Sequence, residues 1–84
     1  MSEIKDLKVI STNKVIFKGS AKKIVIPTLS GEITVLNNHV PIISVIKKGE
    51  IKIVDSEDNT IKLFEVDGGV VDVRKSGEVV VMLA

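Results

Sequence analysis

Hydrophobic residues recur along this chain in short runs that are separated by turn-forming residues. The pattern is most regular in the second half, where Ile51 and Ile53 alternate with charged neighbours. Such alternation places successive side chains on opposite faces of a β-strand. Residues 56–59 are turn formers, and the alternation resumes through Ile61 and Leu63. This pattern predicts a β-hairpin with one face exposed to solvent.

The other apolar runs predict further short strands on both sides of this hairpin. These runs cover residues 7–11, 15–17, 24–26, 32–36, 42–46, 64–66, 70–73 and 79–83. The last run is apolar throughout, which predicts a strand that is buried on both faces, either central in a sheet or covered by a partner. Pro27 is expected at a strand end or edge, because proline cannot donate a hydrogen bond to a ladder. The Gly68-Gly69 pair predicts a positive φ or a close backbone approach.

Nine or ten such strands, with no helical periodicity of useful length, predict an all-β fold of two packed antiparallel sheets. The composition agrees, because the chain has twelve Ile and fourteen Val residues, which favour pleated surfaces. Its 84 residues are expected to form a single domain spanning 1–84.

Charge and aromatic content argue against nucleic acid as a partner. Twelve basic and eleven acidic side chains are scattered along the chain, and Phe17 and Phe64 are its only aromatic residues. Nucleic-acid binding sites instead combine clustered basic residues with stacking side chains. The chain has no cysteine, so neither a disulfide nor thiolate chemistry is expected. Its apolar runs are too short for a membrane span, and no export signal is expected at its start.

The residues that could support catalysis or hold a metal are few. His39 is the only histidine, and no serine has the sequence context of a nucleophile elbow. One histidine without cysteine is a poor set of zinc ligands. We therefore expect no catalytic residue, no metal and no cofactor, and we interpret His39 as a loop residue that bonds to backbone or faces a partner. Gly68-Gly69 lacks the spacing of a phosphate-binding loop.

The segment 27–49 is the expected working surface, because it concentrates the residues with special backbone or proton chemistry. Both prolines, the histidine, an adjacent Asn pair and two of the six glycines lie within it. Loops with such residues commonly carry function. Glu32, directly after Gly31, fits an exposed strand-start carboxylate and an interface residue equally well.

Written as a pattern, this segment reads Pro27, Gly31-Glu32, Val35-Leu36, His39, Pro41 and Gly49. It resembles the amino-terminal domain of the epsilon subunit of F-type ATP synthases, which is called delta in mitochondria. Residues 7–11 with 15–19 resemble the opening hairpin of that family, residues 67–73 its second signature, and residues 79–84 its usual end. The resemblance covers nearly the whole chain.

The resemblance implies a flattened antiparallel β-sandwich of about ten strands in two sheets. It also implies a non-catalytic rotor subunit of the central stalk, which binds the gamma subunit and the c ring and couples ion translocation to ATP synthesis. By position, Gly31 and Glu32 match the c-ring contact. The positions that match the gamma-facing side are Ser11, His39, Val40, Pro41, Ser44 and Val70. The implied location is peripheral, on the cytoplasmic face of the bacterial inner membrane, with the plastid thylakoid or another coupling membrane as the alternative.

Three residues depart from the family pattern, namely Thr34, Val40 and Asp67, where smaller residues are common. Family members usually continue into a carboxy-terminal helical hairpin, whereas this sequence stops at Ala84. Without those helices no nucleotide binding is expected. One alternative is a carrier domain of the biotinyl or lipoyl type, for which Lys48 would be the modified residue, although its neighbours do not match. The other is a generic β-sandwich interaction module.

Overall fold

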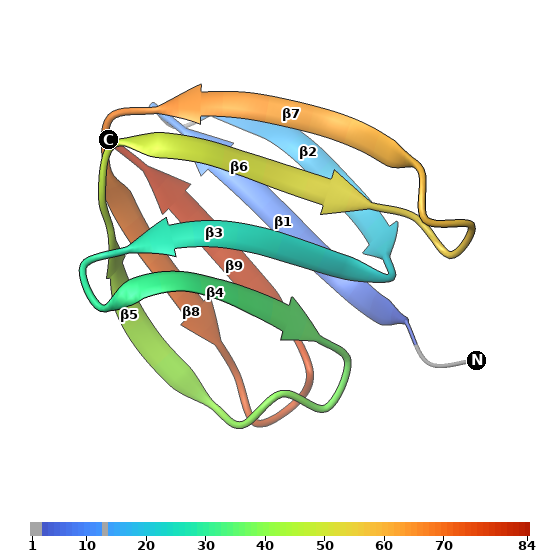
Figure 1. Ribbon diagram of the computed structural model, residues 1–84. Helices are drawn as coiled ribbons and strands as arrows, with labels where there is room; N and C mark the ends of the chain where they lie inside the picture. Colours follow the sequence, from blue (N-terminus) through green and yellow to red (C-terminus); the bar gives the residue numbers. More distant parts are fainter. Residues whose placement is uncertain (1–2, 13) are drawn as a thin grey trace.

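The computed structural model describes residues 3–12 and 14–84, which form β-strands joined by short turns (Figure 1). Nine strands lie within these residues: β1 (Ile4–Ser11), β2 (Lys14–Ala21), β3 (Lys23–Thr28), β4 (Gly31–Leu36), β5 (Ile42–Ile46), β6 (Gly49–Val54), β7 (Thr60–Val66), β8 (Gly69–Val73) and β9 (Val79–Leu83). The predicted all-β fold is confirmed, and nine strands agree closely with the expected ten. No helix in this described part of the chain is long and apolar enough to cross a membrane.

The strands form two layers of one continuous, curled sheet. Hydrogen bonds connect them in the order β2-β1-β9-β8-β5-β3-β6-β7, and β4 pairs with β3. Figure 1 shows β3, β4, β6 and β7 in front of β1, β8 and β9. The layers join where Thr28 of β3 pairs with Ile46 of β5. The pairing of β1 with β9 is parallel, whereas the other strand pairs are antiparallel.

The core lies between the two layers and is built from alternate residues of each strand. In one layer Val9, Val81 and Val71 form a cross-strand row with no solvent exposure. The other layer contributes Ile24 and Ile53, which pair with each other and are also fully buried. Cross-strand pairs of β-branched side chains stabilise such a sheet. The predicted hairpin of alternating residues is β6–β7. The last strand, β9, is central, between β1 and β8, but the predicted burial on both faces holds only for residues 79–81, because Met82 is 41% exposed.

The turns gather at two ends of the sandwich. At one end the loop 37–41, the β8–β9 turn and the start of β1 meet around a shallow depression, which Asn37, Lys5 and Ser76 help to line. At the other end lie the β3–β4 turn, the bend between β5 and β6, and the last residue of the chain. Strand β4 runs from one end to the other. The expected c-ring residues, at the start of β4, are therefore separated from the loop that follows β4.

Candidate functional site

The outer surfaces of the two layers differ in polarity. In the layer β5-β8-β9-β1-β2, one apolar residue from each strand aligns with its neighbour across the ladders. We call this set the apolar row: Val45, Val70, Met82, Ile10 and Val15. Val45 and Val15 are each 51% exposed and Met82 is 41% exposed. Exposed apolar residues gathered on one face mark an interaction surface more often than isolated ones do.

Charged side chains border the apolar row. Two residues along each strand from the apolar row, on the same face, Ile43 pairs with Asp72, Asp72 pairs with Val80, and Val80 pairs with Lys8. Lys8 in turn pairs with Lys18 on β2. An apolar centre with a charged border is the usual arrangement of a protein–protein interface.

The outer face of the layer β4-β3-β6-β7 is more polar. Lys52 pairs with Val25 on one side and with Leu63 on the other, so a charge separates the two apolar residues. The cross-strand pair Glu50–Glu65 adds two carboxylates to the same face. This face lacks an uninterrupted apolar row, which makes the opposite face the stronger candidate for docking a partner.

The loop after β4 presents a second exposed apolar group. Val40 is 67% exposed, and the neighbouring Pro41 is exposed as well. His39 is half-buried, its backbone N–H donates to the carbonyl of Leu36 over 3.2 Å, and its Nδ1 lies 2.8 Å from the carbonyl oxygen of Val40. The imidazole is thus engaged by the backbone of its own loop, in agreement with our interpretation of His39 as a loop residue.

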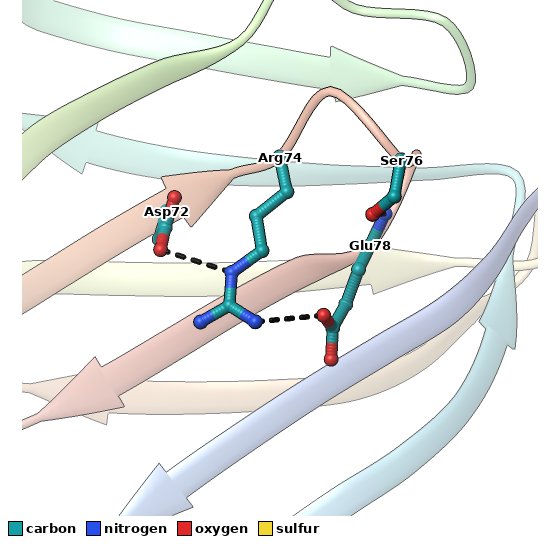
Figure 2. Close-up of polar contacts among 4 residues, drawn as sticks. All are labelled: Asp72, Arg74, Ser76 and Glu78. Carbon is teal, nitrogen blue, oxygen red and sulfur yellow. Dashed lines mark hydrogen bonds and ion pairs between the residues drawn. The ribbon is translucent and has the colours of Figure 1, made fainter.

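An ion-pair cluster fixes the β8–β9 turn beside this loop (Figure 2). The Nε of Arg74 lies 3.1 Å from a carboxylate oxygen of Asp72, and its Nη1 lies 2.8 Å from a carboxylate oxygen of Glu78. Hydrogen bonding to Asp72 and then to Glu78 raises the pKa of Arg74. Pro41 and Ile43 line a shallow groove together with Asp72 and Arg74 of this cluster and with Lys75. The groove therefore has both apolar and charged lining residues.

The β3–β4 turn holds the two residues that match the c-ring contact. Gly31 has a φ of +114°, a conformation that residues with a side chain rarely adopt. Glu32 is exposed on the first part of β4. Between the strands Leu29 projects into solvent with 71% of its surface exposed. This end of the molecule thus combines an acidic group with an apolar one.

The structure brings some of the gamma-facing candidates together and separates others. His39, Val40 and Pro41 share the loop, and Val70 lies in the apolar row beside Val45. Ser44 pairs with the fully buried Val71, which directs its side chain toward the core face of its strand.

Ser11 lies apart from the loop. The residue opposite Ser11 on β9 is aligned, across β8, with Ile46 on β5, so Ser11 and Ile46 lie at the same height in the sheet. The loop, in contrast, precedes Ile42. Four residues of strand separate these levels by about 13 Å. The six positions therefore do not form one compact patch.

Sequence reasoning missed four members of the apolar row, Ile10, Val15, Val45 and Met82. The strands that carry most of them read as runs with apolar residues at consecutive positions. A run of this kind signals that both faces of a strand meet apolar surroundings. β9 shows this signal over its whole length, and β5 and β8 show it in part. Only the register shows that their outward residues align.

A family model described as ATP synthase, delta/epsilon chain, beta-sandwich domain matches residues 5–84. The chain belongs to this family. The epsilon-type prediction from the sequence is thereby confirmed at the level of the domain, and family membership disfavours the carrier-domain alternative.

Relatives within the delta/epsilon family include the ATP synthase epsilon chain of Bordetella avium, which is 41% identical over 66 residues, or 79% of this chain and 46% of the relative. The epsilon chain of Neisseria meningitidis serogroup C is 36% identical over 72 residues, or 84% of this chain and 51% of the relative. The chain thus spans about half the length of the curated relatives that it matches.

Solved structures show the same delta/epsilon fold. A chain in the mitochondrial ATP synthase of Euglena gracilis, in a structure of OSCP, F1 and the c-ring, aligns with a TM-score of 0.86 at 21% identity. That alignment covers 94% of this chain and 49% of the other. A chain in the central stalk and c-ring structure from Tetrahymena thermophila mitochondria aligns with a TM-score of 0.78 at 15% identity, covering 94% of this chain and 62% of the other.

Proposed function

We propose that this domain is a non-catalytic part of the central stalk of a rotary ATP synthase, where it binds the gamma subunit and the c ring. In that position it couples ion translocation to ATP synthesis. Membership of the delta/epsilon family supports the proposal. The observation that carries it is the apolar row, which crosses five hydrogen-bonded strands on one face of the sandwich.

The apolar row suits a permanent partner such as the gamma subunit. Its residues are fixed in register by ladder hydrogen bonds, so little conformational entropy is lost when a partner covers them. Lys8 and Asp72 supply charges at its border. We assign the gamma contact to the apolar row, which includes Val70, and to the loop residues His39, Val40 and Pro41. The other two positions expected from the sequence are not part of this assignment, because Ser44 faces the core and Ser11 lies apart from the loop.

The contact with the c ring is assigned to Gly31 and Glu32 in the β3–β4 turn. This turn lies at one end of β4, and the loop with Val40 follows the other end. Two partners can therefore bind the domain at separate places on a rigid scaffold. A coupling role needs such an arrangement, because the domain must hold gamma and the c ring at the same time.

The non-catalytic assignment is supported by membership of the delta/epsilon family. The proposed location is peripheral, through the assembled complex, on the cytoplasmic face of a bacterial inner membrane. The bacterial source of the Bordetella and Neisseria relatives supports this location over a thylakoid.

The proposal is tested by a pull-down of the 84-residue chain with purified gamma subunit and, separately, with purified c ring from the same source. The Val40→Asp variant serves as the comparison, because its exposed position makes the substitution tolerable to the fold. Binding to gamma that the variant loses would support the stalk role. If the unaltered chain binds neither partner, the proposal is wrong.

A further inference from the structure

The β3–β4 turn is held by a side chain that is completely buried. Thr28 has no solvent exposure, and it is the one buried polar residue among those that the structure describes. Its Oγ1 donates a hydrogen bond of 2.6 Å to the carbonyl of Gly31 and accepts one of 3.2 Å from the amide of Ser30. A buried hydroxyl with both partners in place fixes the local backbone in one conformation.

The same turn is tied to β5 by backbone hydrogen bonds. The amide of Leu29 donates to the carbonyl of Val45 over 3.1 Å, and the amide of Lys47 donates to the carbonyl of Pro27 over 3.0 Å. The amides of both residues at the tip, Leu29 and Ser30, are therefore satisfied within the domain. A partner can cover this tip without leaving an amide of Leu29 or Ser30 unpaired, which would otherwise cost binding free energy.

Leucine is an unusual residue at such a tip. Turns favour Gly, Pro, Asn, Asp and Ser, each for a conformational or hydrogen-bonding reason that leucine does not share. Leu29 is nevertheless held away from the core, with 71% of its surface exposed. A large apolar side chain on a rigid, hydrogen-bonded turn has the properties of an interface anchor, because little order is lost when it is buried.

We propose that Leu29 is an apolar anchor in the contact with the c ring, and that Thr28 positions it. The proposal rests on the proposed function and adds two residues to Gly31 and Glu32. The partner surface that fits is a small apolar depression in the polar loops of the ring, with a basic group at its border to pair with Glu32. Thr28 acts through the turn and does not touch the partner itself.

The test compares affinities of variants of the 84-residue chain for detergent-solubilised c ring and for gamma subunit, by calorimetry. Leu29→Ala is expected to bind the c ring about tenfold more weakly, as for a truncated anchor residue. Leu63→Ala is the matched control, since Leu63 is 55% exposed on β7, and its affinity is expected to stay within about twofold of the original.

The role of Thr28 is tested by a pair of substitutions. Thr28→Val keeps the shape of the side chain but removes the hydroxyl, and it is expected to weaken c-ring binding while leaving gamma binding unchanged. Thr28→Ser keeps the hydroxyl and is expected to restore c-ring affinity. If Thr28→Val weakens both contacts equally, the residue serves only general stability and the positioning role is wrong.

Failure of this proposal can be told apart from failure of the stalk role. If the unaltered chain binds the c ring and Glu32→Gln weakens that binding while Leu29→Ala does not, Leu29 is not an anchor, although the proposed function stands. If the unaltered chain binds neither the c ring nor gamma, both proposals are wrong.

Discussion

Gly69 lies so close to the carbonyl oxygen of Met82 that a Cβ atom on Gly69 would overlap that oxygen. The same Cβ would also lie 3.0 Å from the Cα of Leu83, the residue opposite Gly69 in the ladder. Gly69 has a φ of +151° as well. The contact lies between β8 and β9, and Gly69 also pairs with Ile46 of β5 on its other side. All three strands belong to the layer that carries the apolar row. The contact between Gly69 and Met82 is the close backbone approach that the glycine pair in the sequence predicts.

Replacing Gly69 with alanine should therefore destabilise the domain strongly. Gly69→Ala is expected to lower the free energy of unfolding by at least about 3 kcal/mol, because the added carbon forces two backbones apart. Gly77→Ala is the matched control, since Gly77 also has a positive φ, +97°, but has open space around it. The free energy of unfolding of Gly77→Ala should fall by only about 1–2 kcal/mol, because of backbone strain. Equal losses in urea denaturation would contradict the steric explanation.

The apolar row should be sensitive to a charge in a way that the other face is not. Val45→Asp is expected to weaken gamma binding by about tenfold or more, because it buries an unpaired carboxylate at the proposed interface. Leu63→Asp places the same group on the opposite face at similar exposure, 55% against 51%. Gamma binding measured by calorimetry should be unchanged in this control. A similar loss in both variants would mean that gamma does not bind the apolar row specifically.

The ion pair between Lys22 and Asp58 should give stability a pH dependence at acid pH. The Lys22 ammonium lies 2.6 Å from an Asp58 carboxylate oxygen and, chiefly by its hydrogen bond, lowers the pKa of Asp58. The stabilisation by this ion pair is therefore fully present at pH values above the ordinary pKa of aspartate, about 4. It is lost as the pH falls through the lowered pKa of Asp58.

We expect Asp58→Asn to be less stable than the original protein at pH 7, and the difference to disappear at acid pH, once the pH has fallen below the lowered pKa of Asp58. Asparagine is a suitable replacement because it tolerates the positive φ of this position, +65°. Urea denaturation midpoints at both pH values measure the difference. A gap between the two proteins that persists at the lower pH would show that the ion pair is not its cause.

Neighbouring residues on β6 should differ sharply in their effect on stability. Ile53 is fully buried in the core, and Ile53→Ala should lower the free energy of unfolding by about 2–5 kcal/mol, whereas Ile53→Val should lower it by about 0.5–1.5 kcal/mol. Lys52 points to the exposed face, so Lys52→Ala should change stability by no more than about 0.5 kcal/mol. Comparable losses at the two positions would contradict the assigned faces of β6.

Much of this architecture could be predicted because it depends on short-range patterns. The alternation around Ile51 and Ile53 identifies both the β6–β7 hairpin and its buried side, since the period of a strand is local to it. Turn formers at residues 56–59 define the connection, and the glycine pair at the start of β8 marks the close contact with Met82. The motifs of the segment 27–49 identified the family, because their order and spacing are also properties of the chain itself.

The candidate surfaces depend on strand pairings that no local pattern contains. The parallel pairing of β1 with β9 brings Ile10 beside Met82, which lies at the other end of the chain, and thereby completes the apolar row. The bridge between Thr28 and Ile46 likewise ties the β3–β4 turn to β5. The sequence alone determined which segments form strands and which residues are apolar. The tertiary structure decided which outward residues become neighbours, because register between distant strands follows from packing the whole core at once.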